Sequence, residues 1–159
     1  MRKILIATDG SAASAEAVEF GVELAAEHEA AVIFVHVAPG LDVLPMAGSG
    51  MAGAVARVPH KTTPHDRRPL EAAEETAGAH GVRASTKLLV GDTVDEIVAY
   101  ADSEDVDLIV VGSRGRGALA GALLGSVSRG VLSESKRPVM IVRGEAAAPD
   151  RELSVAAGR

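Results

Sequence analysis

A stretch rich in glycine, serine and arginine, residues 112–128, holds the clearest chemical pattern of the chain. Its glycines lack a Cβ atom, so backbone N–H groups beside them can approach a ligand closely. A helix that begins near Ser126 would add N–H groups at a helix N-terminus, a place that favours anions. Arg114 and Arg116 contribute positive charge. The pattern therefore predicts a phosphate site, formed by Gly112, Arg114, Gly115, Gly125, Ser126, Val127 and Ser128.

Two common phosphate motifs do not fit this stretch. A P-loop requires a Gly-Lys pair, and the chain contains none. A dinucleotide fold requires G-x-G-x-x-G at the first strand-to-helix turn, where the chain has Asp9-Gly10-Ser11. A flexible connection that binds nothing stays an alternative for residues 112–125.

Short apolar runs predict the strands that position this stretch. We expect five of them, at Lys3–Ala7, Ala31–Val37, Val82–Val90, Asp107–Val111 and Pro138–Val142, with amphipathic helices between them. Such β-α-β units form a parallel sheet with right-handed crossovers. Ligands bind beyond the carboxyl ends of its strands, so Thr8, Asp9 and Val111 should line one site together with the loop that follows Val111.

One domain accounts for residues 1–144. Within it, prolines and glycines without periodicity predict a long mobile loop over residues 38–66, followed by a short helix from Pro69 to about His80. Residues 145–159 lack periodicity and predict a disordered tail.

Composition narrows the classes of function. Sixteen basic and 22 acidic residues give the 159-residue chain a formal charge of −6, which disfavours nucleic acid as a partner. The absence of cysteine removes disulfides, Cys-zinc sites and a thiol nucleophile, and His60 with His65 supplies too few ligands for a metal site. Apolar runs are too short for a membrane span, so we expect a soluble, cytoplasmic domain.

The spacing Gly112-x2-Gly115-x9-Gly125-Ser126 resembles the nucleotide-binding signature of the universal stress protein family. The likeness extends over roughly residues 1–143 and includes the opening Lys-Ile-Leu-Ile-Ala-Thr-Asp-Gly-Ser run. The resemblance implies a Rossmann-like α/β fold with an open five-stranded parallel sheet of order 3-2-1-4-5. It also implies a homodimer and, in the branch that carries the signature, bound ATP.

The resemblance also assigns roles to single residues. Asp9 matches the acidic residue that hydrogen-bonds the ribose, and Thr8 beside it helps to shape the pocket. Val37 matches the position whose backbone reads the adenine edge, while the glycine-rich stretch matches the phosphate loop. Mg²⁺ would bridge the phosphates through oxygen ligands and water, because no His/Cys cluster is available.

We expect a nucleotide-binding regulatory module of the stress response, with protein partners that the sequence does not identify. No residue is assigned a catalytic role, because hydrolysis needs a placed base, and the resemblance gives Asp9 to the ribose. The alternatives are an interaction module of the same family that has lost the nucleotide, and a weak ATPase. The apolar edge strand Val139–Val142 predicts the homodimer contact, since pairing with a second copy would cover it.

Overall fold

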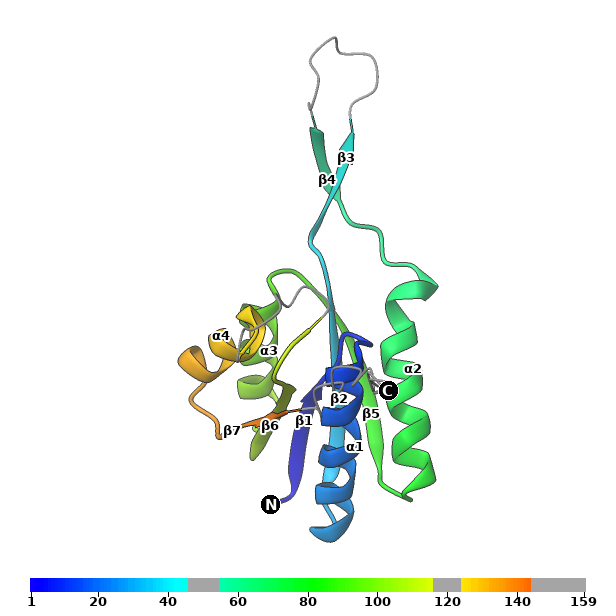
Figure 1. Ribbon diagram of the computed structural model, residues 1–159, viewed down its shortest axis with the longest axis vertical. Coiled ribbons are helices and arrows are strands. Elements are labelled where there is room, and N and C mark those ends of the chain that lie inside the picture. Colours follow the sequence, from blue (N-terminus) through cyan, green and yellow to red (C-terminus); the bar gives the residue numbers. More distant parts are fainter. Residues whose placement is uncertain (46–54, 116–123, 144–159) are drawn as a thin grey trace, which may run out of the picture.

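The apolar runs form one parallel sheet, as the sequence predicts. The computed structural model describes residues 1–45, 55–115 and 124–143. The sheet has the order β5-β2-β1-β6-β7, which is the expected order when the five strands are counted along the chain (Figure 1). Its strands are β1 (Lys3–Ala7), β2 (Ala31–Ala38), β5 (Ala84–Val90), β6 (Leu108–Gly112) and β7 (Val139–Val142).

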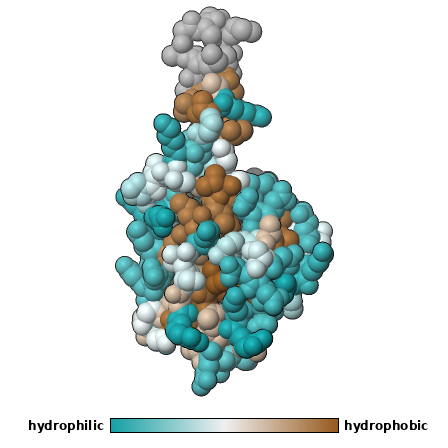
Figure 2. Space-filling model, turned by 180° about the vertical axis from the view of Figure 1, so that it is seen from behind, coloured by the Kyte–Doolittle hydropathy of each residue, from teal (hydrophilic) through white to brown (hydrophobic). Residues whose placement is uncertain are grey.

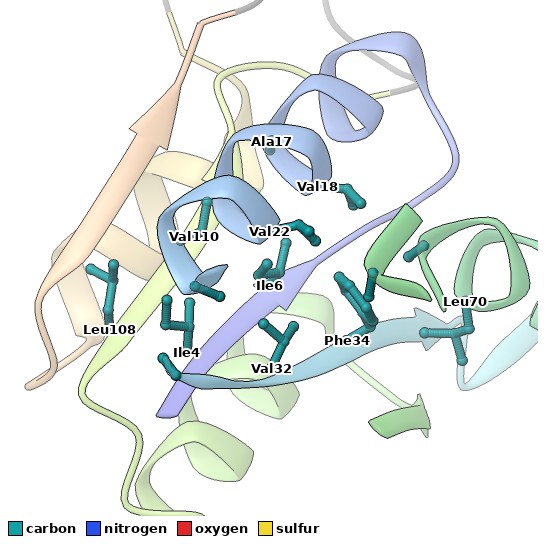
Figure 3. Packing of buried hydrophobic residues seen from close by; sticks show 14 residues of the cluster. Ile4, Ile6, Ala17, Val18, Val22, Val32, Phe34, Leu70, Leu108 and Val110 are labelled. Atoms are coloured by element: carbon teal, nitrogen blue, oxygen red, sulfur yellow. The ribbon is translucent and has the colours of Figure 1, made fainter. Parts of the chain in front are cut away.

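Helices cover both faces of this sheet. The helices α1 (Ala12–Glu27) and α2 (Pro64–Ala79) pack on one face, and α3 (Thr93–Ser103) and α4 (Ser126–Glu134) pack on the other. Alternate side chains of β1 therefore enter different cores. Ile4 and Ile6 face α1 (Figure 3). Leu5 joins the core beneath α3 and α4. Among the residues that the structure describes, Phe34 is the largest side chain that is fully buried.

Polar caps set where two helices begin. The side chain of Ser11 accepts from the N–H of Ser14 and caps α1. The Asp92 carboxylate accepts from the N–H groups of Val94 and Asp95 and caps α3. The spacing of Thr93 and Glu96 suggests instead that Thr93 is the cap. That reading is wrong, because Thr93 is already the first helical residue.

Residues 38–66 contain more regular structure than expected. The strands β3 (Leu41–Pro45) and β4 (Val55–Pro59) pair with each other as an antiparallel hairpin that projects from the sheet (Figure 1). α2 begins at Pro64, not Pro69, because proline fits the first helical position and Asp66 bonds back to the N–H of Thr63. Whether this segment is mobile stays a prediction, and residues 46–54 lie outside the described ones.

The hairpin carries apolar side chains on its surface. Leu41, Val43 and Val55 are about half exposed or more, and Figure 2 shows hydrophobic surface along the projecting arm.

β7 forms the edge of the sheet opposite β5, as Pro138 at its start predicts. The tail predicted for residues 145–159 lies outside the described residues. Among the helices that the structure describes, none is both long and apolar enough to cross a membrane.

Candidate functional site

A cavity of about 290 Å³ opens at the carboxyl ends of β1, β2 and β6. β1 lies between β2 and β6, and the chain crosses over in opposite directions on its two sides, which is where ligands bind in open parallel sheets. All the site residues expected from the sequence line this one cavity: Thr8, Asp9, Val37, Val111, Gly112, Arg114, Gly115, Gly125, Ser126, Val127 and Ser128.

The loop after β1 is held in place by its own hydroxyl groups. The Thr8 N–H donates to the Val35 carbonyl at 2.9 Å, which anchors the start of the loop to β2. The Thr8 hydroxyl lies 3.2 Å from the Ser14 hydroxyl, and the Asp9 N–H donates to that same Ser14 oxygen at 3.4 Å. The Asp9 carboxylate accepts from the Ser11 N–H at 2.9 Å. These bonds fix the position of the Asp9 carboxylate at the cavity wall.

The two ends of the glycine-rich stretch are tied to each other. The Gly125 N–H donates to the Ser113 carbonyl at 2.7 Å, and the Ser113 N–H donates to the Val142 carbonyl at 2.7 Å. The Ser128 hydroxyl lies 3.2 Å from the same Ser113 carbonyl and 3.1 Å from the Gly125 carbonyl. Its proton is therefore directed to the loop backbone. Ser128 is buried, lines the cavity and holds the two ends of the loop together.

The three glycines of the stretch meet different neighbours. A Cβ atom on Gly112 would lie 2.7 Å from the Ala13 carbonyl oxygen, so this glycine lets the first turn of α1 pack on β6. A Cβ on Gly115 would lie 2.8 Å from the Asp9 Oδ2 atom, so here the two loops touch. A Cβ on Gly125 would come no closer than 3.6 Å to its neighbours. Gly115 therefore faces the side chain of Asp9 across the cavity, whereas Gly112 faces the backbone of α1.

The start of α4 forms one end of the cavity, and a helix N-terminus is a place that favours anions. Gly125 is the N-cap and has no side chain that could occupy the first N–H groups of the helix. Ser126 and Val127 are the first two residues of this helix and line the cavity. Among the described lining residues, Arg114 is the one with a permanent positive charge and Asp9 the one with a carboxylate. Arg116 lies outside the described residues.

Sequence reasoning missed several residues of the wall. Ala7, Ser14, Val35, Thr93 and Ile97 also line the cavity. Ser14 could have been found, because it lies one helical turn after the Ser11 cap and faces the same loop. His36 also lies in the wall, where its Nδ1 donates to the Thr8 carbonyl at 2.8 Å.

Known proteins share both the sequence and the fold of this chain. Universal stress protein MJ0531 of Methanocaldococcus jannaschii is 33% identical over 142 residues, which cover 89% of this chain and 82% of that protein. Universal stress protein YxiE of Bacillus subtilis is 37% identical over 145 residues, with 89% of this chain and 98% of that protein covered.

Solved structures extend the comparison. A universal stress protein crystallised in complex with cAMP has a TM-score of 0.65 and 30% identity, with 89% of this chain and 95% of that chain covered. The universal stress protein of Archaeoglobus fulgidus in complex with dAMP has a TM-score of 0.63 and 26% identity, with 89% and 97% covered. The sequence pattern of the universal stress protein family matches residues 1–143. The chain belongs to the universal stress protein family.

Proposed function

We propose that the cavity binds ATP and that the protein acts as a nucleotide-binding regulatory module of the stress response. The observation that carries this proposal is the convergence of the first loop, the end of β2 and the start of α4 on one cavity. Adenine nucleotides in two solved structures of the family support the choice of base. The triphosphate is the finer part of the proposal and rests on the glycine-rich signature.

The residues present fit such a ligand. The backbone of Val37 lies at the wall beyond β2 and would contact the adenine edge, and the Asp9 carboxylate would accept from a ribose hydroxyl. Phosphates would lie against the N–H groups of Gly115, Ser126 and Val127, at the positive end of the α4 dipole. A volume of about 290 Å³ is at the lower end of the ~300–1,000 Å³ typical of ligand pockets. Part of the triphosphate would therefore extend out of the cavity.

Mg²⁺ is the metal that suits this ligand. It prefers oxygen ligands and keeps several waters, so phosphate oxygens and water would supply most of its coordination. Asp9, the acidic side chain of the described lining, is assigned to the ribose and would therefore contribute no ligand to the ion. The ion would neutralise phosphate charge beside a chain whose net charge is −6.

We expect the protein to hold ATP without turning it over efficiently. Hydrolysis needs a base within hydrogen-bond reach of a water, together with charge stabilisation that grows in the transition state. The carboxylate of the described wall, that of Asp9, is assigned here to the ribose and not to the terminal phosphate, so it is not the base that hydrolysis needs. Turnover should lie well below the ~1 s⁻¹ low end of typical enzymes.

Variants of the glycine-rich stretch test the site. Gly115→Val combined with Gly125→Val adds side chains at the cavity, one of them against Asp9, and should weaken ATP binding more than about tenfold in calorimetry. Gly78→Ala is the matched control: it lies in α2 and its added Cβ meets nothing within 4 Å. Circular dichroism should show that both proteins are folded. Unchanged affinity in the double variant would contradict the proposed site.

A second candidate function is an interaction module without nucleotide. The exposed Leu41, Val43 and Val55 on the projecting hairpin favour it, because apolar surface of this kind often contacts another protein. One protein can have both functions. If the protein bound no nucleotide, the interaction module would be its sole proposed function. We further propose the homodimer through β7, and the cytoplasmic location stays a prediction that cell fractionation would test.

A further inference from the structure

One histidine joins the hairpin to α2 through both of its ring nitrogens. His60 follows β4, and its Nδ1 lies 2.8 Å from the Oδ1 atom of Asp42 on β3. Its Nε2 lies 3.2 Å from the Oδ2 atom of Asp66, in the first turn of α2. The side chain of His60 is only 12% exposed, so the ring is enclosed between the two elements.

This geometry determines the charge of the ring. An ionised carboxylate can only accept hydrogen bonds, and a neutral imidazole has one N–H and one lone pair. A neutral His60 ring would therefore donate a hydrogen bond to only one of the two carboxylates, that of Asp42 or that of Asp66. Its lone pair would face an oxygen of the other carboxylate, which repels it. The doubly protonated ring donates to both carboxylates, so the observed arrangement belongs to the imidazolium form of His60.

The protonation of the neighbouring groups agrees with this assignment. Hydrogen bonds to Asp42 and then to Asp66 raise the pKa of His60 above 6.5. The N–H of Thr63 is the main cause that lowers the pKa of Asp66 to about 2, so this carboxylate is ionised throughout the neutral range. The same elements and their linker also carry the cations Arg57, Lys61, Arg67 and Arg68 and a second histidine, His65, and none of these residues is among the causes of the His60 shift.

We propose that protonated His60 is a pH-dependent clamp that fixes the hairpin to the N-terminus of α2, and that loss of its proton releases the hairpin. A group whose pKa is raised on folding stabilises the folded arrangement below that pKa. The clamp is therefore closed at acidic and near-neutral pH and opens as the pH rises through the His60 pKa. Asp66 stays bonded to Thr63 in both states, so α2 keeps its first turn.

Opening the clamp would affect how the apolar arm is presented. The N–H of His60 also donates to the Gly40 carbonyl at 3.1 Å, at the base of the hairpin. This base directly continues β2, whose Val37 lines the cavity. The clamp therefore sets the direction of the exposed side chains Leu41 and Val43 relative to the sheet. Figure 2 shows how far this hydrophobic arm projects from the body.

Two measurements on the full chain test the clamp. In NMR, the ring signal that is absent from His60→Gln belongs to His60, and it should titrate above pH 6.5. The second measurement is the distance between two spin labels, one on the hairpin and one on α2. The chain has no cysteine of its own, so the labels attach only to the two introduced cysteines, Val43→Cys and Glu74→Cys, which are both exposed positions. We expect the distance distribution between hairpin and α2 to be at least twofold broader at about pH 8.5 than at about pH 5.5.

Matched variants separate the charge of His60 from other effects of pH. His60→Gln in the labelled chain should give the broad distribution at both pH values, and His60→Arg, which stays charged, should give the narrow one at both. His65→Gln removes an exposed histidine of the first turn of α2 and should respond to pH as the parent chain does. A His60 pKa at or below 6.5, or an unchanged pH response in His60→Gln, would overturn the proposal. The test uses no nucleotide, so it is independent of the proposed function.

Discussion

Replacing Gly112 by alanine tests whether the first glycine of the signature serves the fold. The added Cβ would lie 2.7 Å from the carbonyl oxygen and 3.0 Å from the carbonyl carbon of Ala13. These are backbone atoms of the first turn of α1, so no change of rotamer relieves the contact. α1 would have to move away from β6, and it packs there against fully buried side chains such as Val110.

The cost follows from the size of the overlap. Overpacking a core costs typically ~1–3 kcal/mol, and we expect the Gly112→Ala variant to lie near about 3 kcal/mol, because backbone must shift. The free energy of unfolding of a domain is only ~5–15 kcal/mol, so this loss is substantial. With a urea dependence of about 2 kcal/mol per M, the unfolding midpoint should fall by about 1.5 M.

Gly125→Ala is the control within the same stretch. Its added Cβ comes no closer than 3.6 Å to the Arg114 Cα and the Ser113 carbonyl oxygen, which is ordinary contact. We expect it to cost less than about 1 kcal/mol, mostly from the change at an N-cap. Far-UV circular dichroism during urea unfolding measures both variants, since the chain has no tryptophan. Equal midpoints for Gly112→Ala and the parent chain would refute the packing role of Gly112.

Two further predictions concern the sheet edge and the N-terminal segment. Val139→Lys combined with Ile141→Lys should convert the proposed dimer to a monomer in sedimentation, because like charges would face each other across paired β7 strands; an unchanged dimer would place the contact elsewhere. Backbone N–H groups of Arg2 and Lys3 lower the pKa of Asp107, so this carboxylate stabilises the fold above pH 3.8 and loses its effect as the pH falls through its lowered pKa. The parent chain should melt at a higher temperature than Asp107→Asn, and this difference should be constant from pH 5 to 7 and shrink below pH 3.8. A difference that does not change with pH would contradict the role of the Asp107 carboxylate.

The parallel sheet could be predicted because its central strands β1, β2 and β6 are buried on both faces. Runs such as Ile4–Ile6 and Leu108–Val111 are continuous and apolar, and this pattern distinguishes them from half-exposed strands. The site followed from the same reasoning, since the carboxyl ends of parallel strands meet at one edge. Other wall residues could not be predicted because they lie far from the phosphate loop in the sequence. Thr93 and Ile97 reach the cavity from α3, and no sequence motif connects this helix to the phosphate loop.

The hairpin could not be predicted in the same way. β3 and β4 pair only with each other among the described strands, so neither is buried on two faces. Both strands contain exposed apolar residues, such as Val43. Because they cover no core, their sequences need not alternate between apolar and polar residues. Prolines at positions 59 and 64 are typical of loops, yet here one ends a strand and the other begins a helix. The His60 contacts depend on this hairpin and were therefore hidden as well.

The nucleotide content of freshly purified protein tests the central claim most directly. The protein would be denatured without added ligand, and the released small molecules identified and quantified by mass spectrometry. The proposed function predicts ATP, near one molecule per chain, with Gly115→Val and Gly125→Val together removing it. Release of no adenine nucleotide, together with no binding of added ATP and Mg²⁺, would contradict the proposal and leave the interaction module as the function of this chain.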